Sequence, residues 1–265
     1  MKTCLRYCKL LGLLAGMQLK TTIIYRMDVL LWLFVSLLWT LFNFFLFSVL
    51  VQVRGDLAGW NQAELFVLVG VFTLLDAFIW SWLSRSMSQM TEHIYLGTLD
   101  LILVRPVDIQ FLLSFSSFGY TNTLRFLLGA VMIGINLQIL AIQPTLLDWV
   151  LATIAFFAGL AIVYAFWFFV STMAFFFDRI ENIHEMVPSL RRFMEVPAPV
   201  FTGTIGMVFT FIFPLLIVTN VPANILLGRA QYELFAYLVV FALVAVMASR
   251  WWFQLCLRRY SGVGS

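Results

Sequence analysis

The chain has little charge. Only 11% of its 265 residues are Asp, Glu, Lys or Arg, whereas soluble domains carry about 25%. Hydrophobic residues make up 63% of the chain, and its mean hydropathy is +0.99. This composition excludes a water-exposed surface over most of the chain and indicates an integral membrane protein.

The long apolar runs also lack the alternation of apolar and polar residues that is typical of membrane β-strands. Residues 41–50, for example, read LFNFFLFSVL. Runs of this kind suit helices, which need about 20 residues to cross the hydrocarbon core. The sequence therefore predicts an all-α membrane protein.

Residues for several kinds of chemistry are scarce or missing. The three cysteines (Cys4, Cys8, Cys256) and two histidines (His93, His184) fit neither a disulfide framework nor a metal site. The chain contains no Gly-Lys pair for a phosphate-binding P-loop and no G-x-S-x-G motif for a nucleophile. We therefore expect no catalytic residue, metal or cofactor on this chain. Its basic residues flank apolar runs instead of clustering, so nucleic acid is not an expected partner.

The sequence predicts six transmembrane helices in a single domain over residues 1–265. An amphipathic interfacial helix is expected over 1–26, without a cleavable signal peptide, because basic residues and leucines alternate there at helical spacing. With the N-terminus inside, all of the 16 Lys and Arg except Arg54 and Arg229 fall on the cytoplasmic side. Both termini are thus predicted to be cytoplasmic. The expected spans are 29–51, 65–83, 126–142, 149–177, 204–218 and 234–248, with turns at 143–145 and 219–224 and a short re-entrant or interfacial helix at 225–233.

A polar stretch, residues 85–110, separates the second and third expected spans. It has a helical rhythm, a glycine break at Gly97 and a stop at Arg105-Pro106, because proline disfavours helical geometry at the preceding residue. Such an element in an apolar chain predicts a contact outside the bilayer. The candidate contact residues are Glu92, His93, Tyr95, Gly97, Leu99, Asp100, Arg105, Pro106 and Asp108.

The expected spans contain a second group of candidates, the polar residues Asn43, Asp76 and Asn136. A carboxylate in lipid is costly, so Asp76 is expected to face the bundle interior or a water-filled cavity. Asp76 could bind a cation or relay protons, or it could be hydrogen-bonded to a neighbouring helix. No Lys or Arg is expected at similar depth to pair with it. The two asparagines are expected to link helices by hydrogen bonds.

Four segments carry a resemblance to a known family: residues 25–32 (YRMDVLLW), 59–60 (GW), 97–107 (GTLDLILVRPV) and 213–223 (FPLLIVTNVPA). The third closely resembles a G-x-L-D-x-x-L-x-R-P signature. Through these segments essentially the whole chain resembles the six-span permease subunits of ABC-2 type transporters, and more narrowly the bacterial ABC-2 family transporter proteins.

The resemblance implies an exporter permease in the bacterial cytoplasmic (inner) membrane. It implies a second permease subunit, identical or related, and a separate P-loop ATPase subunit that binds ATP and Mg²⁺. The resemblance also implies that the N-terminal helix, here 1–26, is a connecting helix that lies along the membrane surface. The segment at 85–110 would form a coupling helix that is seated on the ATPase. Two other classes stay open: an ion-coupled secondary transporter that uses Asp76, and a membrane scaffold that transports nothing.

Overall fold

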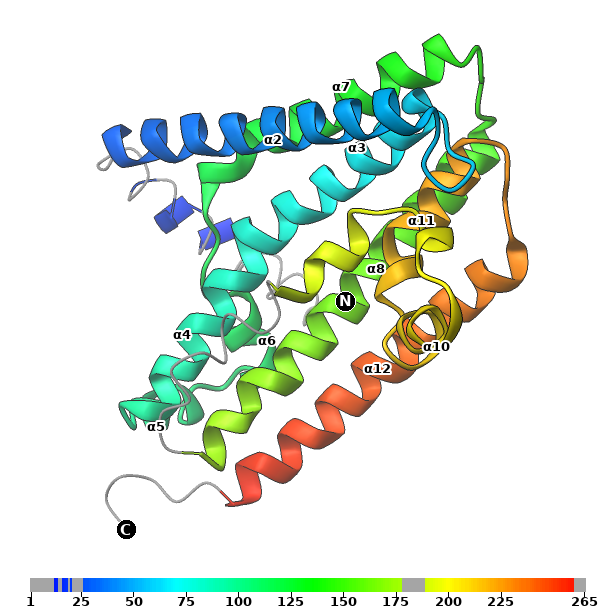
Figure 1. Cartoon of the computed structure of the whole chain (residues 1–265). Coiled ribbons are helices and arrows are strands. Elements are labelled where there is room, and N and C mark those ends of the chain that lie inside the picture. The colour runs from blue at the N-terminus through cyan, green and yellow to red at the C-terminus, as the bar shows by residue number, and fades with distance from the viewer. Residues whose placement is uncertain (1–11, 14–15, 19, 21–25, 178–188, 260–265) are drawn as a thin grey trace.

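The computed structural model describes residues 12–13, 16–18, 20, 26–177 and 189–259 (Figure 1). Within these ranges every regular element is a helix, and the β-type pairing is confined to an isolated bridge between Leu57 and Trp60. The predicted helical class is thus confirmed, whereas most of the predicted amphipathic helix at 1–26 lies outside the described residues. The elements are α2 (Arg26–Arg54), α3 (Gln62–Phe78), η1 (Ile79–Leu83), α4 (Ser84–Tyr95), α5 (Asp100–Leu103), α6 (Ile109–Phe115), η2 (Tyr120–Asn122), α7 (Thr123–Ile139), α8 (Leu146–Thr172), η3 (Met173–Phe175), η4 (Arg191–Met194), η5 (Ala198–Val200), α10 (Gly203–Met207), η6 (Val208–Ile212), α11 (Leu215–Leu226) and α12 (Tyr232–Arg259).

The number of membrane spans is four or five by helix length and composition. Four described stretches qualify, at Val29–Val53, Gln62–Tyr95, Leu146–Phe175 and Tyr232–Arg258, and the bent pair Gly203–Ile212 with Leu215–Leu226 gives a fifth if it counts as one span. Helix α7 has 17 residues and is therefore about 26 Å long, less than the roughly 30 Å hydrocarbon core. The chain is a multi-pass helical membrane protein, and the six predicted spans are not confirmed.

The predicted fifth span is broken. The chain bends by 81° between the helices that end at Ile212 and begin at Leu215. Pro214 accounts for the break, because proline has no N–H and disfavours helical geometry at the residue before it, Phe213. The predicted turn at 219–224 is wrong, since these residues continue α11, in which Thr219 and Asn220 are buried.

Helix α3 is the centre of the bundle. Of its most apolar stretch 78% is buried, against 11% for α2 and 17% for α12. Glycines bring the inner helices close together. A Cβ on Gly129 of α7 would lie 2.9 Å from the Gly70 carbonyl oxygen of α3, and one on Gly159 of α8 would lie 3.0 Å from the Val218 carbonyl oxygen of α11. Small residues allow this close approach of membrane helices.

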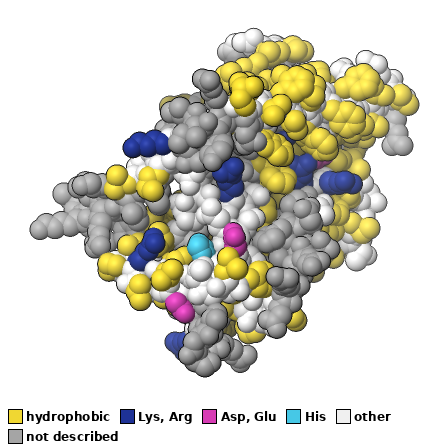
Figure 2. Space-filling view, turned by 90° about the vertical axis from the view of Figure 1, so that its left-hand side faces the viewer, with side chains coloured by type: hydrophobic (Ala, Val, Ile, Leu, Met, Phe, Trp, Pro, Cys, Tyr) yellow, Lys and Arg dark blue, Asp and Glu magenta, His cyan; other side chains and the backbone are white. Residues whose placement is uncertain are grey.

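The bundle has two polar ends. The α5 end holds α5, the start of α2 and the ends of α8 and α12, on the left-hand side of Figure 1. Seen face on, it shows basic, acidic and histidine side chains among apolar ones (Figure 2). The opposite end, called the Gln62 end, holds the turns around residues 55–61, 140–145 and 227–231. Capping boxes at Asn61 and Thr145 start α3 and α8 there, and the predicted turn before Thr145 is confirmed.

Candidate functional site

The chain turns sharply at the α5 end. Helix α4 ends at Tyr95, and Gly97 has a positive φ of 66°, which glycine adopts without strain. The Leu99 N–H then donates to the His93 carbonyl oxygen at 3.1 Å, and His93 Nδ1 lies 2.8 Å from the Thr98 hydroxyl oxygen. The glycine break is therefore a folded turn fixed to the end of α4.

Asp108 closes this segment. Its Oδ1 accepts a 2.9 Å hydrogen bond from the Phe111 N–H, which caps α6, and its Oδ2 accepts one of 2.7 Å from Arg250 Nη2 of α12. The bond from Arg250 is the main reason that the pKa of Asp108 lies below its ordinary value of 3.8, with burial acting in the opposite direction. Asp108 thus holds the polar segment against α12.

The outermost part of the segment, which we call the α5 tip, consists of exposed Leu96, Leu101 and Val104 together with Glu92, Asp100 and Arg105. The three apolar side chains are 65%, 66% and 81% exposed. The three charged side chains are also exposed, and Leu99 and Ile102 anchor the tip from below as buried residues. An exposed apolar cluster bordered by charges is typical of a protein-binding surface. Of the other predicted contact residues, His93 and Tyr95 are half-buried at the base of the tip, and Pro106 is exposed beside it.

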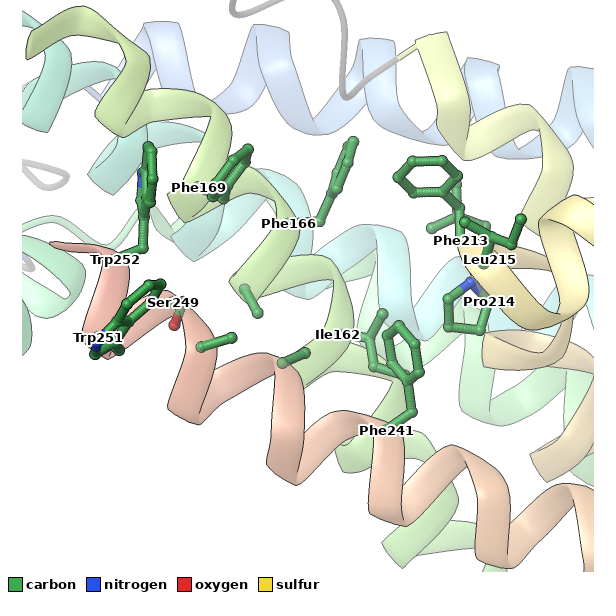
Figure 3. A pocket seen from close by; sticks show the side chains of 14 residues that line it. Ile162, Phe166, Phe169, Phe213, Pro214, Leu215, Phe241, Ser249, Trp251 and Trp252 are labelled. Atoms are coloured by element: carbon green, nitrogen blue, oxygen red, sulfur yellow. The ribbon is translucent and has the colours of Figure 1, made fainter. Parts of the chain in front are cut away.

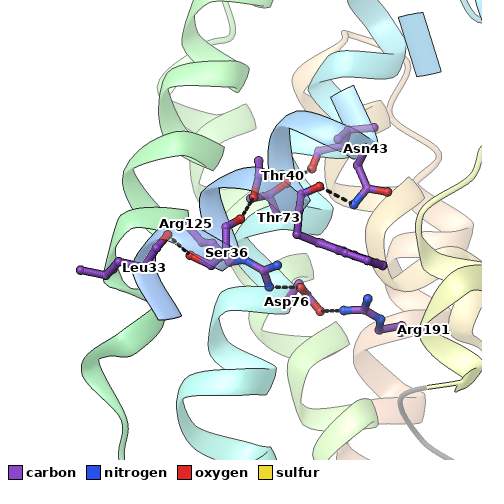
Figure 4. Close-up of polar contacts among 10 residues, drawn as sticks. Leu33, Ser36, Thr40, Asn43, Thr73, Asp76, Arg125 and Arg191 are labelled. Carbon is purple, nitrogen blue, oxygen red and sulfur yellow. Dashed lines mark hydrogen bonds and ion pairs between the residues drawn. The ribbon is translucent and has the colours of Figure 1, made fainter. Parts of the chain in front are cut away.

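Asp76 lies at the centre of the second group. Its carboxylate pairs with Arg125 of α7 through Oδ2 and with Arg191 of η4 through Oδ1, the latter at 2.7 Å (Figure 4). The three side chains are 3%, 7% and 14% exposed. The prediction that Asp76 has no basic partner at similar depth is therefore wrong. The reason is that Arg125 lies in the first turn of α7, on the face of that helix that packs against α3, where its side chain is buried instead of extending to the membrane surface.

Arg191 is also held by aromatic rings. Its guanidinium carbon lies 5.7 Å from the centre of the Trp39 ring and 5.8 Å from that of the Trp80 ring. Both distances fit cation–π contacts. The Asp76 cluster, defined as Asp76, Arg125 and Arg191, therefore joins α2, α3, η1, α7 and η4. The sequence analysis did not identify either arginine as a partner of Asp76. The signal available in the sequence was that both arginines lie close to apolar segments.

The two asparagines bond within their own helices. Asn43 Nδ2 donates to the Trp39 carbonyl oxygen at 3.1 Å, and Asn136 Nδ2 donates to the Met132 carbonyl oxygen at 2.8 Å. These bonds run to the residue four positions earlier, so they do not provide the predicted links between helices.

Residues 191–200 pack against α11 as short 3₁₀ turns. Irregular backbone at membrane depth needs hydrogen-bond partners within the protein. Thr219 Oγ1 donates to the Met194 carbonyl oxygen at 2.6 Å, and Asn220 Oδ1 accepts from the Ala198 N–H at 2.8 Å. Residues that the sequence analysis placed in an external turn thus support η4, and with it Arg191, beside Asp76.

An apolar groove of about 280 Å³ lies between α8, α12 and the break at Pro214 (Figure 3). Phe166, Phe169, Phe241 and Trp251 are among its lining residues. Ser249 also lines it, but its hydroxyl donates to the Val246 carbonyl oxygen of the same helix. The groove surface is therefore hydrocarbon and aromatic, which suits lipid tails better than a polar ligand. Across the described ranges no three His, Cys, Asp or Glu side chains gather in a way that could hold a metal ion.

The long apolar helices and the broken helix pair define a multi-pass helical membrane protein. Comparison with protein families identifies it further: the profile of the ABC-2 family transporter proteins matches residues 37–264. The chain belongs to this family and is a membrane permease component. A search of curated proteins found no match.

Proposed function

We propose that the chain is the permease subunit of an ABC-2 type exporter, driven by ATP that a separate P-loop ATPase subunit hydrolyses with Mg²⁺. The α5 tip is the observation that carries this proposal. It exposes three large apolar side chains among charged ones at a polar end of the bundle. A soluble partner with an apolar pocket and complementary charges would cover both parts of this surface.

The proposal includes an orientation. The α5 end and both termini face the cytoplasm of a bacterium, and the Gln62 end faces outside. The distribution of Lys and Arg supports this orientation. The test is labelling of single cysteines at Asp56 and Arg258 in a variant without native cysteines. We expect a membrane-impermeant reagent to label the Asp56→Cys variant in intact cells and the Arg258→Cys variant only after lysis; the reverse pattern would refute the orientation.

Docking of the ATPase is tested by mutating the α5 tip. The tagged chain is purified from cells that co-express a neighbouring P-loop ATPase gene, and the retained ATPase is quantified. We expect the Leu101→Asp variant and the Glu92→Lys/Asp100→Lys variant each to retain at least about tenfold less ATPase, because truncated anchor residues and reversed charges weaken an interface by 2 kcal/mol or more. The matched control is Asp56→Lys, which adds the same kind of charge to the exposed turn at the Gln62 end. Equal retention in all variants would contradict the proposed docking.

A second permease subunit, identical or related, completes the proposed assembly. Helix α2 supports this part of the proposal, since only 11% of its most apolar stretch is buried within the chain. Cross-linking of single cysteines on α2 in native membranes tests it, and we expect a product of twice the subunit mass.

The ion-coupled alternative needs a carboxylate that is free to bind a cation. In the structure Asp76 is already neutralised by Arg125 and Arg191. A sodium ion or proton would have to displace a buried guanidinium group, which is expensive. We therefore favour the ATP-driven permease. The test uses vesicles that contain the chain and carry an ion gradient but no ATP. Transport by these vesicles would support the ion-coupled alternative instead.

A further inference from the structure

A second recess lies beside the Asp76 cluster, toward the α5 end. Its volume is about 480 Å³, within the range of sites for small ligands. We call it the Trp–Arg recess. Its lining includes Trp32, Trp39, Trp80, Arg85, Arg125 and Arg191.

The recess has more positive than negative charge. Three guanidinium groups line it, those of Arg85, Arg125 and Arg191. Asp76 faces two of them from the neighbouring cavity, to which Glu195 also contributes. Even with both carboxylates ionised, the three guanidinium groups carry one more charge than Asp76 and Glu195 can neutralise.

The buried guanidinium group of Arg125 is incompletely hydrogen-bonded within the described residues. The residue is 6% exposed, and its Nε is buried without a hydrogen-bond partner among the described residues. A buried donor left unpaired is costly, and a guanidinium group offers two donors in a plane that match a carboxylate or phosphate. Asp76 occupies only Nη1 of this group. The guanidinium group has five N–H donors, so Asp76 leaves it incompletely paired, and an anionic ligand in the recess would add acceptors beside it.

Arg85 sits at the opening of the recess. It is exposed, and its side chain lies along Gly119, where an added Cβ would be 3.0 Å from Arg85 Nε. It therefore stands outside the Asp76 cluster while adding its charge to the recess. Arg85 is a suitable residue for mutation, because the fold does not depend on burying it.

The remaining lining is aromatic. Trp32 is 56% exposed and Trp39 is 45% exposed, and both come from α2, whose surface is largely uncovered. A ligand head bound by the arginines would thus leave its apolar body against indole rings and close to the lipid. This pairing of charge and apolar surface selects an amphiphile over a small inorganic anion.

We propose that the Trp–Arg recess binds an amphiphile with a phosphate or carboxylate head group, and that it discriminates against cationic amphiphiles. This inference rests on the proposed function, since it assigns a chemical class to the cargo or to a membrane lipid that occupies the cargo path. The guanidinium groups bind the head, and Trp32 and Trp39 contact the apolar body.

The test uses the purified full chain, without ATPase, in a neutral detergent. Tryptophan fluorescence is titrated with dodecyl phosphate and, separately, with dodecyltrimethylammonium. We expect saturable binding of dodecyl phosphate alone, weakened about tenfold or more in Arg85→Gln, because hydrogen bonds to charged groups are the strong ones. Arg85→Lys should lose less, since it keeps the charge but not the planar fork. Arg258→Gln, an exposed residue at the end of α12, should bind as the unmodified chain does.

Equal binding of the two amphiphiles, or equal affinities in Arg85→Gln and Arg258→Gln, would overturn the inference. The two sources of such a ligand are separated in nanodiscs. If the occupant is a membrane lipid, the chain should bind less dodecyl phosphate in nanodiscs of phosphatidylglycerol than in nanodiscs of phosphatidylcholine, because the anionic lipid competes for the recess. If the occupant is cargo, the chain should bind dodecyl phosphate equally well in the two kinds of nanodisc. Because no ATPase is present, these results are independent of whether the α5 tip docks one.

Discussion

Removing the Asp76 charge should destabilise the bundle strongly. Asp76→Asn keeps the shape of the side chain but leaves Arg125 and Arg191 facing each other at side-chain exposures of 7% and 14%. Breaking a buried ion pair by removing one partner costs about 3–5 kcal/mol. Since Asp76 serves two arginines that come from different elements, we expect a loss of free energy of unfolding within this range.

The assay is equilibrium unfolding of the purified chain by dodecyl sulfate in mixed micelles. The control is Asp56→Asn, an exposed residue in the turn after α2, whose effect should stay within about 0.5 kcal/mol. The double variant Asp76→Asn/Arg125→Gln should be more stable than the sum of the single effects predicts, by about 1 kcal/mol or more.

Two results would refute the reasoning. One is a stability of Asp76→Asn that equals that of Asp56→Asn, which would mean that the carboxylate is not an essential counter-ion. The other is strict additivity in the double variant, which would mean that Asp76 and Arg125 do not interact energetically.

Three further predictions concern the packing, the α5 end and the long central helix. Gly129→Ala should cost about 1–3 kcal/mol of stability because its Cβ would lie 2.9 Å from a carbonyl oxygen of α3, whereas Gly134→Ala, with open space around it, should cost nothing measurable. The bond from Arg250 lowers the pKa of Asp108 below 3.8, so the stabilisation that Asp108 provides is complete above this pH and is lost as the pH falls further. The stability difference between Asp108→Asn and the unmodified chain should therefore be at most about 1 kcal/mol at pH 6, since both groups are partly exposed, and should shrink progressively as the pH falls below 3.8. Ser88→Pro, in the exposed face of α4, should break that helix at a cost of about 3 kcal/mol and lower the amount of the proposed ATPase that is retained by the α5 tip, while Ser88→Ala should leave it unchanged. Equal retention in both would contradict a role for an unbroken α4.

Local sequence signals predicted the glycine break and the proline stop of the α5 segment, but not the exposed Leu96, Leu101 and Val104 of the α5 tip, nor the burial of Leu99. Gly97 has the positive φ that its position in the break required, and Pro106 follows the end of the short helix α5. Such features depend on a few neighbouring residues, so they can be inferred without knowing the packing. The turn before Thr145 was predictable for the same reason.

The Asp76 cluster could not be predicted in this way. Arg125 is 49 residues from Asp76 in sequence, and Arg191 is 115 residues away. Their meeting depends on the depth and rotation of three elements, whereas charge counting assigns only a side of the membrane. The break at Pro214 was missed for a related reason, because the mean hydropathy of a window stays high across a proline that redirects the chain.

The central helix connects the two candidate sites. The stretch Gln62–Tyr95 has 34 residues, so it is about 51 Å long and extends about 20 Å beyond a 30 Å hydrocarbon core. Asp76 and Arg85 lie on it, and Glu92 of the α5 tip stands near its end. The π-helical turn η1 directs Trp80 toward Arg191 without interrupting the helix, and such turns often occur at functional sites. A partner that moves the α5 tip would therefore move the wall of the Trp–Arg recess through a continuous helix, without an intervening loop to absorb the displacement.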